Sequence, residues 1–234
     1  TRMKLTLTLP VLSLLLWTTA AAQTSVAGTS ASYETRDSIT RGPYTLIVIN
    51  KQEGFDTAVI NRMVETYFTV YPKLAETFNR EAAKKVTFLI DPSYEGVAAT
   101  ARDVIMYNPE WFVKHPGDID VVTHEAMHVV QAYKRHVPGW VTEGIADYVR
   151  YKFGVDNEGA GWKLPAFSPE HSYRDSYRIT ARFFNWIEEN IKKGFVVALD
   201  SRARAGQYNA AVWKEITGKT LDELWQEYAA SHQQ

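Results

Sequence analysis

The sequence predicts an α+β fold in which a small N-terminal mixed sheet precedes an all-helical C-terminal part. Three short apolar runs, at 44–50, 85–91 and 103–108, have the length and composition of β-strands. From about residue 177 the apolar residues recur at helical spacing instead. The 234 residues are enough for one domain with a sizeable core. We therefore expect a single domain over 42–234, with an N-terminal lobe over about 42–137 and a C-terminal lobe over about 138–234.

The first 22 residues have the composition of a secretory signal peptide. Two basic residues precede an apolar run over 5–17, and small residues follow up to Ala22. A short transmembrane anchor is the alternative, but Pro10 and threonines interrupt the run. We expect cleavage near Ala22, a secreted or periplasmic protein, and no stable membrane insertion. Residues 23–41 are rich in Ser, Thr, Ala and Gly and are expected to be a linker.

Helices are expected between the predicted strands. Apolar residues in 55–71 recur at helical spacing, and a second short helix is expected over 72–79. The next predicted helix covers 119–137, where no Gly or Pro interrupts the chain, and Pro138 ends it. Asp118 is a suitable N-cap for this helix. Its apolar stripe consists of Val122, Ala126, Val129 and Tyr133.

This helix carries the sequence His-Glu-x-x-His. His124 and His128 are four residues apart, so both rings can point toward one spot. Glu125 follows the first histidine and can reach a water bound at that spot. The pattern is typical of a hydrolytic zinc site, which has neutral nitrogen ligands, an adjacent carboxylate base and an open coordination position.

A third protein ligand is needed, and the following segment offers Glu143, Asp147 and His136. Glu143 and Asp147 share one face of a second predicted helix, so one carboxylate can bind the metal while the other supports it. Asp147 could accept the far ring N–H of a zinc histidine. His136 is expected to be a solvated residue at the end of the first helix. Gly144 has no side chain and would let the second helix approach the first closely.

Residues 155–170 contain several glycines and prolines and are predicted to form a long loop beside the motif. Trp162 and Phe167 could line a substrate cleft there, although single aromatic residues more often serve packing. Four helices are expected to follow, at 177–192, 195–203, 209–217 and 221–230, the last with a capping box of Thr220 and Glu223.

A hydrolytic zinc site also needs a hydrogen-bond donor for the developing oxyanion. His171, Tyr173 and Tyr177 lie between the predicted loop and the following helix and are candidates for this donor. The alternative for Tyr177 is a packing role under the loop, with its hydroxyl satisfied locally.

The segment HEAMHVVQAY…PGWVTEGIADYVRYKFG resembles the basic secretory protein family, a family of secreted zinc metallopeptidases of plants and bacteria. The EGIADY piece is also similar to the wider gluzincin pattern, in which the glutamate is the third zinc ligand. Similarity extends to the segments that begin at Ser176 and at Thr220, so it covers most of the chain from about Tyr44. The chain departs from the family name in not being basic.

The resemblance implies a zincin-like fold with Zn²⁺ as the cofactor. It implies that His124, His128 and Glu143 are zinc ligands and that Glu125 is the general base, and it favours Tyr177 as the oxyanion donor. In zincin-like folds an edge strand beside the metal pairs with an extended substrate. Residues 104–108 are the candidate for that edge, and an ordinary interior strand is the alternative.

Composition excludes several other classes of function. The formal net charge is −1, and removal of residues 1–22 would lower it by two more, so no electrostatic argument favours nucleic acid or an anionic membrane. The absence of cysteine excludes disulfides and thiolate chemistry. The motif and the resemblance to a peptidase family instead imply a protein or peptide substrate.

The sequence thus predicts a secreted zinc metallopeptidase that uses an activated water and a glutamate general base. One alternative is a secreted zinc-containing module that binds protein or glycan with little turnover, although such a module has no need for Glu125. The other alternative is a zinc amidase or esterase that does not act on peptides, which only a substrate screen would separate from a peptidase.

Overall fold

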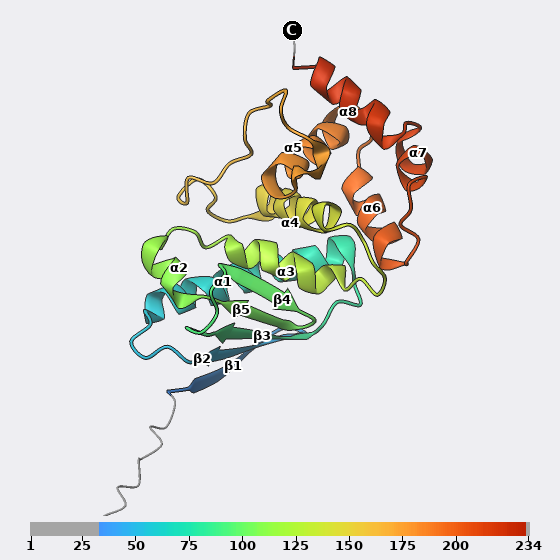
Figure 1. Cartoon of the computed structure of the whole chain (residues 1–234). Coiled ribbons are helices and arrows are strands. Elements are labelled where there is room, and N and C mark those ends of the chain that lie inside the picture. The colour runs from blue at the N-terminus through green and yellow to red at the C-terminus, as the bar shows by residue number, and fades with distance from the viewer. Residues whose placement is uncertain (1–32, 233–234) are drawn as a thin grey trace, which may run out of the picture. The chain divides into compact units, whose positions relative to one another are not determined.

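The structure is a computed structural model that describes residues 33–232. The predicted signal peptide and residues 23–32 of the predicted linker lie outside these residues. Within the described part of the chain, an N-terminal mixed sheet with its helices is followed by a C-terminal region that is entirely helical (Figure 1). The prediction of an α+β chain with this order is confirmed. None of the described helices is long and apolar enough to cross a membrane.

The sheet has five strands, which are β1 (Thr35–Arg41), β2 (Tyr44–Asn50), β3 (Lys85–Ile90), β4 (Ala98–Ala101) and β5 (Val104–Tyr107). Their order is β1-β2-β3-β5-β4. β2, β3 and β5 run parallel, whereas β1 pairs antiparallel with β2 and β4 antiparallel with β5. The sheet is therefore mixed, with an antiparallel strand at each edge.

Two strands were not predicted, and both are edges. β1 falls within the predicted linker, so the linker prediction is wrong for 35–41. Its side chains are nearly all exposed, so it has no hydrophobic alternation, and backbone pairing with β2 holds it in place. β4 has the sequence Ala-Ala-Thr-Ala, which carries little β-strand signal. Because β4 covers one side of β5, the prediction that residues 104–108 form the free edge is wrong.

Helix α1 (Thr57–Phe78) continues through Pro72, where two helices were predicted. Proline lacks the N–H that would bond to the preceding turn, which normally favours a break. The buried residues continue across Pro72 without a change of face, from Tyr67 and Tyr71 to Leu74 and Phe78, so packing on the sheet outweighs the lost hydrogen bond. The Tyr67 ring lies 5.5 Å from that of Phe88 in β3.

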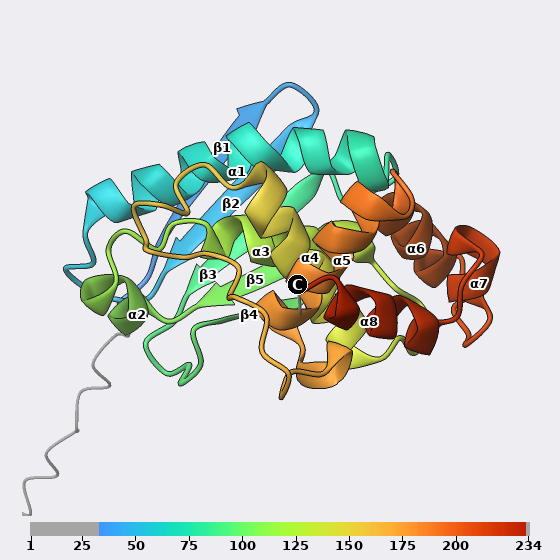
Figure 2. The same cartoon turned by 90° about the horizontal axis from the view of Figure 1, so that it is seen from above.

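Helix α3 (Val121–Gln131) lies with α1 over the same face of the sheet (Figure 2). The predicted helix over 119–137 is six residues too long at its C-terminus. Ala132 takes a left-handed conformation, with φ of 44°, and Tyr133 leaves the helix so that its hydroxyl donates to the buried carboxylate of Asp200. His136 is exposed but lies outside the helix.

The N-cap of α3 is Asp120 rather than Asp118. The Asp120 carboxylate is fully buried and accepts hydrogen bonds from the hydroxyl of Thr123 and the backbone N–H groups of Val155 and Asp156. It therefore ties the start of α3 to the start of the loop after residue 154.

The remaining helices are α2 (Pro109–Lys114), which was not predicted, α4 (Gly139–Phe153), the 3-10 turn η1 (Tyr173–Asp175), α5 (Tyr177–Asn190), α6 (Phe195–Arg204), α7 (Val212–Thr217) and α8 (Leu221–Ala230). The predicted capping box of Thr220 and Glu223 is present at the start of α8. Helices α5 and α7 are shorter than predicted, by two residues at the C-terminus of α5 and three at the N-terminus of α7.

Gly144 permits a close helix contact, but the neighbour is α5 rather than the predicted α3. A β-carbon at residue 144 would lie 2.3 Å from Cγ2 of Thr180 and 3.1 Å from the Phe184 ring. The expectation that Gly144 faces the first motif helix is therefore wrong. Glu143 lies on the face of α4 that turns toward α3, whereas Gly144, the next residue, faces α5.

We predict that Gly144→Ala lowers the free energy of unfolding by up to about 2 kcal/mol. Overpacking typically costs about 1–3 kcal/mol, and the better helix propensity of alanine returns about 1 kcal/mol. Urea unfolding measures the change. Gly139→Ala is the matched control, since a β-carbon there has no atom within 4 Å. Thr180→Ser removes the clashing methyl group and should restore stability in the Gly144→Ala background; equal stability of Gly144→Ala and the original chain would contradict the prediction.

Candidate metal centre

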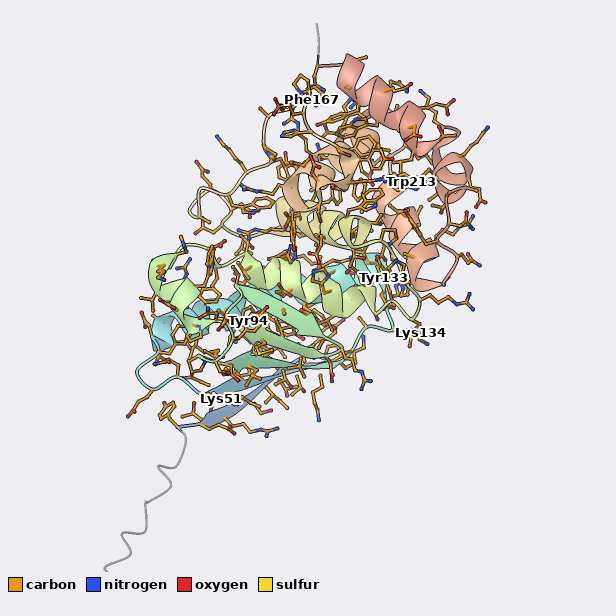
Figure 3. All side chains as sticks on the ribbon, in the orientation of Figure 1. Lys51, Tyr94, Tyr133, Lys134, Phe167 and Trp213 are labelled. Atoms are coloured by element: carbon orange, nitrogen blue, oxygen red, sulfur yellow. The ribbon has the colours of Figure 1, made fainter. Side chains whose placement is uncertain are left out.

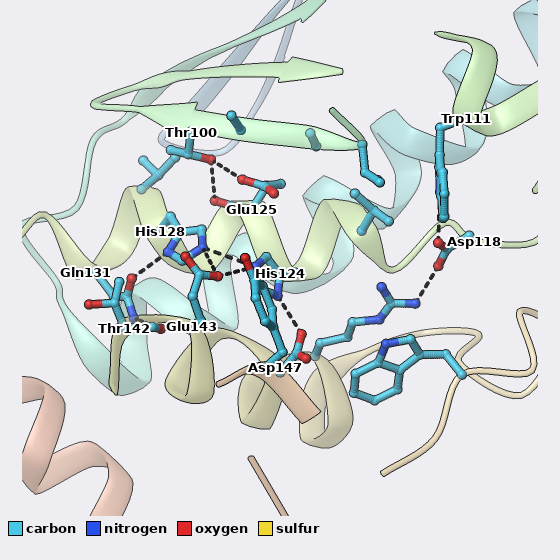
Figure 4. A pocket seen from close by; sticks show the side chains of 18 of the residues that line it. Thr100, Trp111, Asp118, His124, Glu125, His128, Gln131, Thr142, Glu143 and Asp147 are labelled. Carbon is cyan, nitrogen blue, oxygen red and sulfur yellow. Dashed lines mark hydrogen bonds and ion pairs between the residues drawn. The ribbon is translucent and has the colours of Figure 1, made fainter. Parts of the chain in front are cut away.

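Helices α3 and α4 run antiparallel, and polar side chains of each meet those of the other along their length (Figure 4). His124 of α3 contacts Asp147 of α4 through a hydrogen bond of 2.7 Å. Seven residues later on α3, the Gln131 amide donates to the carbonyl oxygen of Thr142, five residues earlier on α4. These contacts fix the register in which the two helices present their side chains to one another.

His124, His128 and Glu143 bring three ligand atoms to one point between the helices. Nε2 of His124 lies 3.1 Å from Nε2 of His128, and Oε2 of Glu143 lies 3.2 Å and 3.4 Å from these nitrogens. Ligand atoms at about 2.0–2.1 Å from a tetrahedral zinc ion are about 3.3 Å apart. The donor set and its spacing therefore fit a metal ion that retains one open position.

Hydrogen bonds at the outer ring nitrogens determine which nitrogen each histidine turns toward this point. Nδ1 of His124 faces Oδ1 of Asp147, and Nδ1 of His128 lies 2.7 Å from Oε1 of Gln131. Both partners are acceptors, so each Nδ1 carries the proton and each neutral ring leaves a lone pair on Nε2. The bond from the Gln131 amide to Thr142 fixes which end of the amide faces His128.

The three converging atoms are all acceptors when both rings are neutral, so the site favours a cation. Burial by itself lowers the pKa of His124, but the hydrogen bonds to Asp147 and Glu143 outweigh it and raise the pKa to about 10. Burial opposes the charge of Glu143 as well, yet its contacts with both histidines hold its pKa well below the usual range. A proton on His124 or a metal ion can therefore balance the carboxylate, and a metal ion must displace that proton to bind.

Glu125 lies on the same helix and lines the cleft that contains the three ligand atoms. It is largely buried, and its Oε2 lies 2.7 Å from the hydroxyl of Thr100 in β4. The same hydroxyl is 3.1 Å from the backbone carbonyl oxygen of Glu125. The edge strand thus holds the carboxylate from the side opposite α4.

Of the three predicted donor candidates, only Tyr177 lines this cleft. Its ring is 55% exposed and stacks on the His124 ring at 6.2 Å. Ser176 and Tyr177 both have positive φ, at 68° and 45°, a conformation that non-glycine residues rarely adopt, so this turn is strained. The Tyr173 hydroxyl instead donates to Asp222, and Nδ1 of His171 accepts from the backbone of Ser168.

The cleft has a volume of about 1650 Å³ and follows the full length of α3. Of the two aromatic residues considered for the cleft, Trp162 lines it and Phe167 does not. Phe167 lies in the C-terminal helical region, where its ring packs against Tyr228 and Trp225 (Figure 3). Phe167 therefore has the packing role, which was the alternative to lining the cleft.

The site contains two polar residues, Gln131 and Thr100, for which the sequence predicted no role. Gln131 lies three residues after His128 and thus on the same helix face, a spacing that could have indicated a partner for that ring. Thr100 has no such signal, because it lies 25 residues before Glu125 in a strand that the sequence does not predict.

Most of the chain matches a known protein family. The model of a family described as BSP, peptidase of plants and bacteria, matches residues 51–228. This range includes all of α1 to α7 and the three residues that could hold a metal ion. No curated protein matches the chain.

We predict that Asp147→Asn and Gln131→Leu each weaken Zn²⁺ binding by about 10- to 100-fold without unfolding the chain, the usual size of an effect on a partner of a metal ligand. An amide at 147 has no charge, and leucine at 131 offers no acceptor to His128. Competition with a chelating dye measures the affinity. Asp222→Asn, an exposed change away from the cleft, is the control. Unchanged affinity in both variants would show that the ring orientations do not depend on these bonds.

Proposed function

We propose that this chain, which belongs to the family of plant and bacterial peptidases, is a secreted zinc-dependent metallopeptidase with a zincin-like fold. The observation that carries the proposal is the convergence of His124, His128 and Glu143, whose outer partners leave only acceptor atoms at the common point. Secretion rests on the composition of residues 1–22 alone.

In the proposed reaction, His124, His128 and Glu143 would hold zinc. When bound, zinc supplies a Lewis acid that lowers the pKa of water toward neutrality and polarises the peptide carbonyl. Glu125 accepts the proton from the attacking water and delivers it to the leaving nitrogen. The hydrogen bond from Thr100 keeps the Glu125 carboxylate at the cleft wall, in position for both transfers.

Tyr177 is the proposed donor to the developing oxyanion. The negative charge of Glu143 and partial burial raise the pKa of Tyr177, so its hydroxyl keeps its proton at neutral pH. The strained turn at Ser176 and Tyr177 places the ring over His124, where the hydroxyl can reach a carbonyl bound beside the ligand group.

The substrate backbone would pair with β4. The backbone N–H of Asn108 bonds to the carbonyl oxygen of Val97. In an antiparallel ladder, the N–H and C=O groups of Ala98 and Thr100 therefore point away from β5. The carbonyl oxygen of Ala98 accepts a hydrogen bond from the Tyr94 hydroxyl, so the N–H of Ala98 and both groups of Thr100 are the ones that a substrate could meet. The small side chains of β4 leave this backbone accessible, and three of its four residues line the cleft. An extended peptide can add to such an edge.

The cleft favours cleavage of internal peptide bonds. Helix α3 is about 15 Å long, which matches about four or five residues of extended chain. Cleft residues continue past the ligand group in both directions, to Asp118 before α3 and to Tyr133 after it. An internal bond of a longer chain can therefore reach the site. A module that only binds would gain nothing from the placement of Glu125, and a long cleft with an edge strand suits a peptide better than a small amide or ester.

We predict about one zinc ion per purified chain, measured by elemental analysis after dialysis. Glu143→Ala should lose most of this zinc while the circular dichroism spectrum stays that of a folded chain, because it removes one of three ligands. If Asp147→Ala loses zinc and Glu143→Ala does not, the third ligand is Asp147. A folded chain that binds no zinc would exclude the metallopeptidase.

We predict that Glu125→Gln binds zinc normally but loses at least about 100-fold in kcat, since general base catalysis typically contributes about 10²–10⁴-fold and an amide cannot accept the proton. Release of peptides from an unstructured protein substrate, with and without chelator, measures the effect. Glu110→Gln, an exposed change on α2, is the control. Full activity in Glu125→Gln would assign the base to another residue.

A further inference from the structure

The cleft end next to the N-terminus of α3 is built from two tryptophans and residues with small or no side chains. Trp111 of α2 and Trp162 of the loop after α4 line it together with Val121. Gly117 and Gly159 also line it and touch, since a β-carbon at 117 would lie 2.8 Å from the Gly159 carbonyl oxygen. This contact holds the loop after α4 against the segment before α3.

The charges at this end are paired with one another. The buried guanidinium of Arg150 bonds to Asp118 and, through Nε, to Asn157 at 3.1 Å. Asp118 also accepts the indole N–H of Trp111 at 2.9 Å. Arg150 lies 4.5 Å from the centre of the Trp162 ring. Both tryptophans are thereby fixed, and neither charged group is left free to select a charged side chain.

This end is one helical turn from the ligand group. Val121 precedes His124 by three residues on α3, and Arg150 follows Asp147 by three residues on α4. One turn is about 5.4 Å, which is less than two residues of extended chain. The side chain that reaches this end therefore belongs to a substrate residue next to the cleaved bond or one position further.

The opposite end of the cleft has a different character. Glu81, Arg102, Asp103 and Tyr133 line it, and the first three are exposed and charged. No ion pair involves Arg102 or Asp103 among the described residues. This end therefore presents exposed charges and small side chains, such as Ala82 and Ala132, and has no tryptophan wall.

We propose that Trp111, Trp162 and Val121 form a subsite for an aromatic or large aliphatic side chain of the peptide substrate, one turn of α3 from the cleaved bond. The occupant is an apolar side chain because the two indoles and Val121 are apolar walls, and the charged groups of Arg150 and Asp118 beside them are paired with each other. His115 also lines this end, with its ring packed on Trp111 at 4.0 Å. This assignment rests on the proposed peptidase function and specifies its substrate class.

The test uses the zinc-loaded full chain and a mixture of peptides with many sequences. Mass spectrometry of the products locates the cleaved bonds and identifies the position at which Phe, Tyr, Trp, Leu or Met is enriched. Matched peptides that differ only there, with Phe, Ala or Asp, then give kcat/KM. We expect kcat/KM for the Phe peptide to exceed that for the Ala peptide by about 10- to 100-fold, the range that differences in buried apolar groups supply.

Variants connect that preference to the subsite. Trp162→Ala should reduce the ratio of kcat/KM for the Phe peptide to that for the Ala peptide to within about threefold. Trp162→Phe should keep most of this ratio, since phenylalanine retains an aromatic wall. Tyr151→Ala changes an exposed aromatic residue of α4 that does not line the cleft; it is the matched control and should leave the ratio unchanged. Calorimetry on the Glu125→Gln chain measures how tightly the uncleaved peptides bind. The Phe peptide should bind more tightly than the Ala peptide, and Trp162→Ala should remove most of this difference.

The outcomes separate the subsite from the peptidase function. Cleavage without apolar enrichment, or a preference that survives Trp162→Ala, would overturn the subsite and leave the peptidase intact. Absence of cleavage of any peptide would overturn the peptidase. The calorimetric affinities would then be the test of the subsite, and equal affinity for the Phe and Ala peptides would contradict it.

Discussion

The antiparallel contact between α3 and α4 is the interaction on which the site depends. Each helix is held from behind by a different part of the fold, α3 by the sheet and α1, and α4 by α5. A set of polar contacts runs along their facing sides, from Arg150 with Asp118, just before α3, at one end to Gln131 with Thr142 at the other. His124, His128 and Glu143 lie in the middle of this set, so their positions follow from the register of the two helices.

The middle of that contact contains a carboxylate that needs a balancing positive charge, either a proton on His124 or a metal ion. Two ring nitrogens and a carboxylate oxygen lie within 3.4 Å of one another, and the outer partners of the rings prevent the rings from turning away. A bound ion would therefore join the part of the chain that contains the sheet to the helical part. Any ligand that binds only the folded state adds to the free energy of unfolding, so zinc would raise the stability of the chain as well as complete the site.

The sequence predicted the parts of the structure that short-range periodicity determines. His124, Glu125 and His128 follow from helical spacing, and the Asp147 contact with a histidine follows from its distance to Glu143 on one helix face. Elements that depend on distant partners were missed or misplaced. The strand that contains Thr100 has no apolar pattern, and α1 passes through Pro72 because of burial on the sheet. The neighbour of Gly144 depends on the order in which α3, α4 and α5 pack, which no local pattern encodes.

The free edge of β4 has a consequence for what the proposed enzyme can attack. Only a chain that is itself extended over several residues can complete the ladder, and a helix or an internal strand of a folded protein already has its backbone groups paired. Native proteins would therefore be cut in segments that open locally, at rates that follow the free energy of that opening. Two proteins with the same apolar residue at the cleavage position would then differ in lifetime according to the rigidity of the surrounding fold.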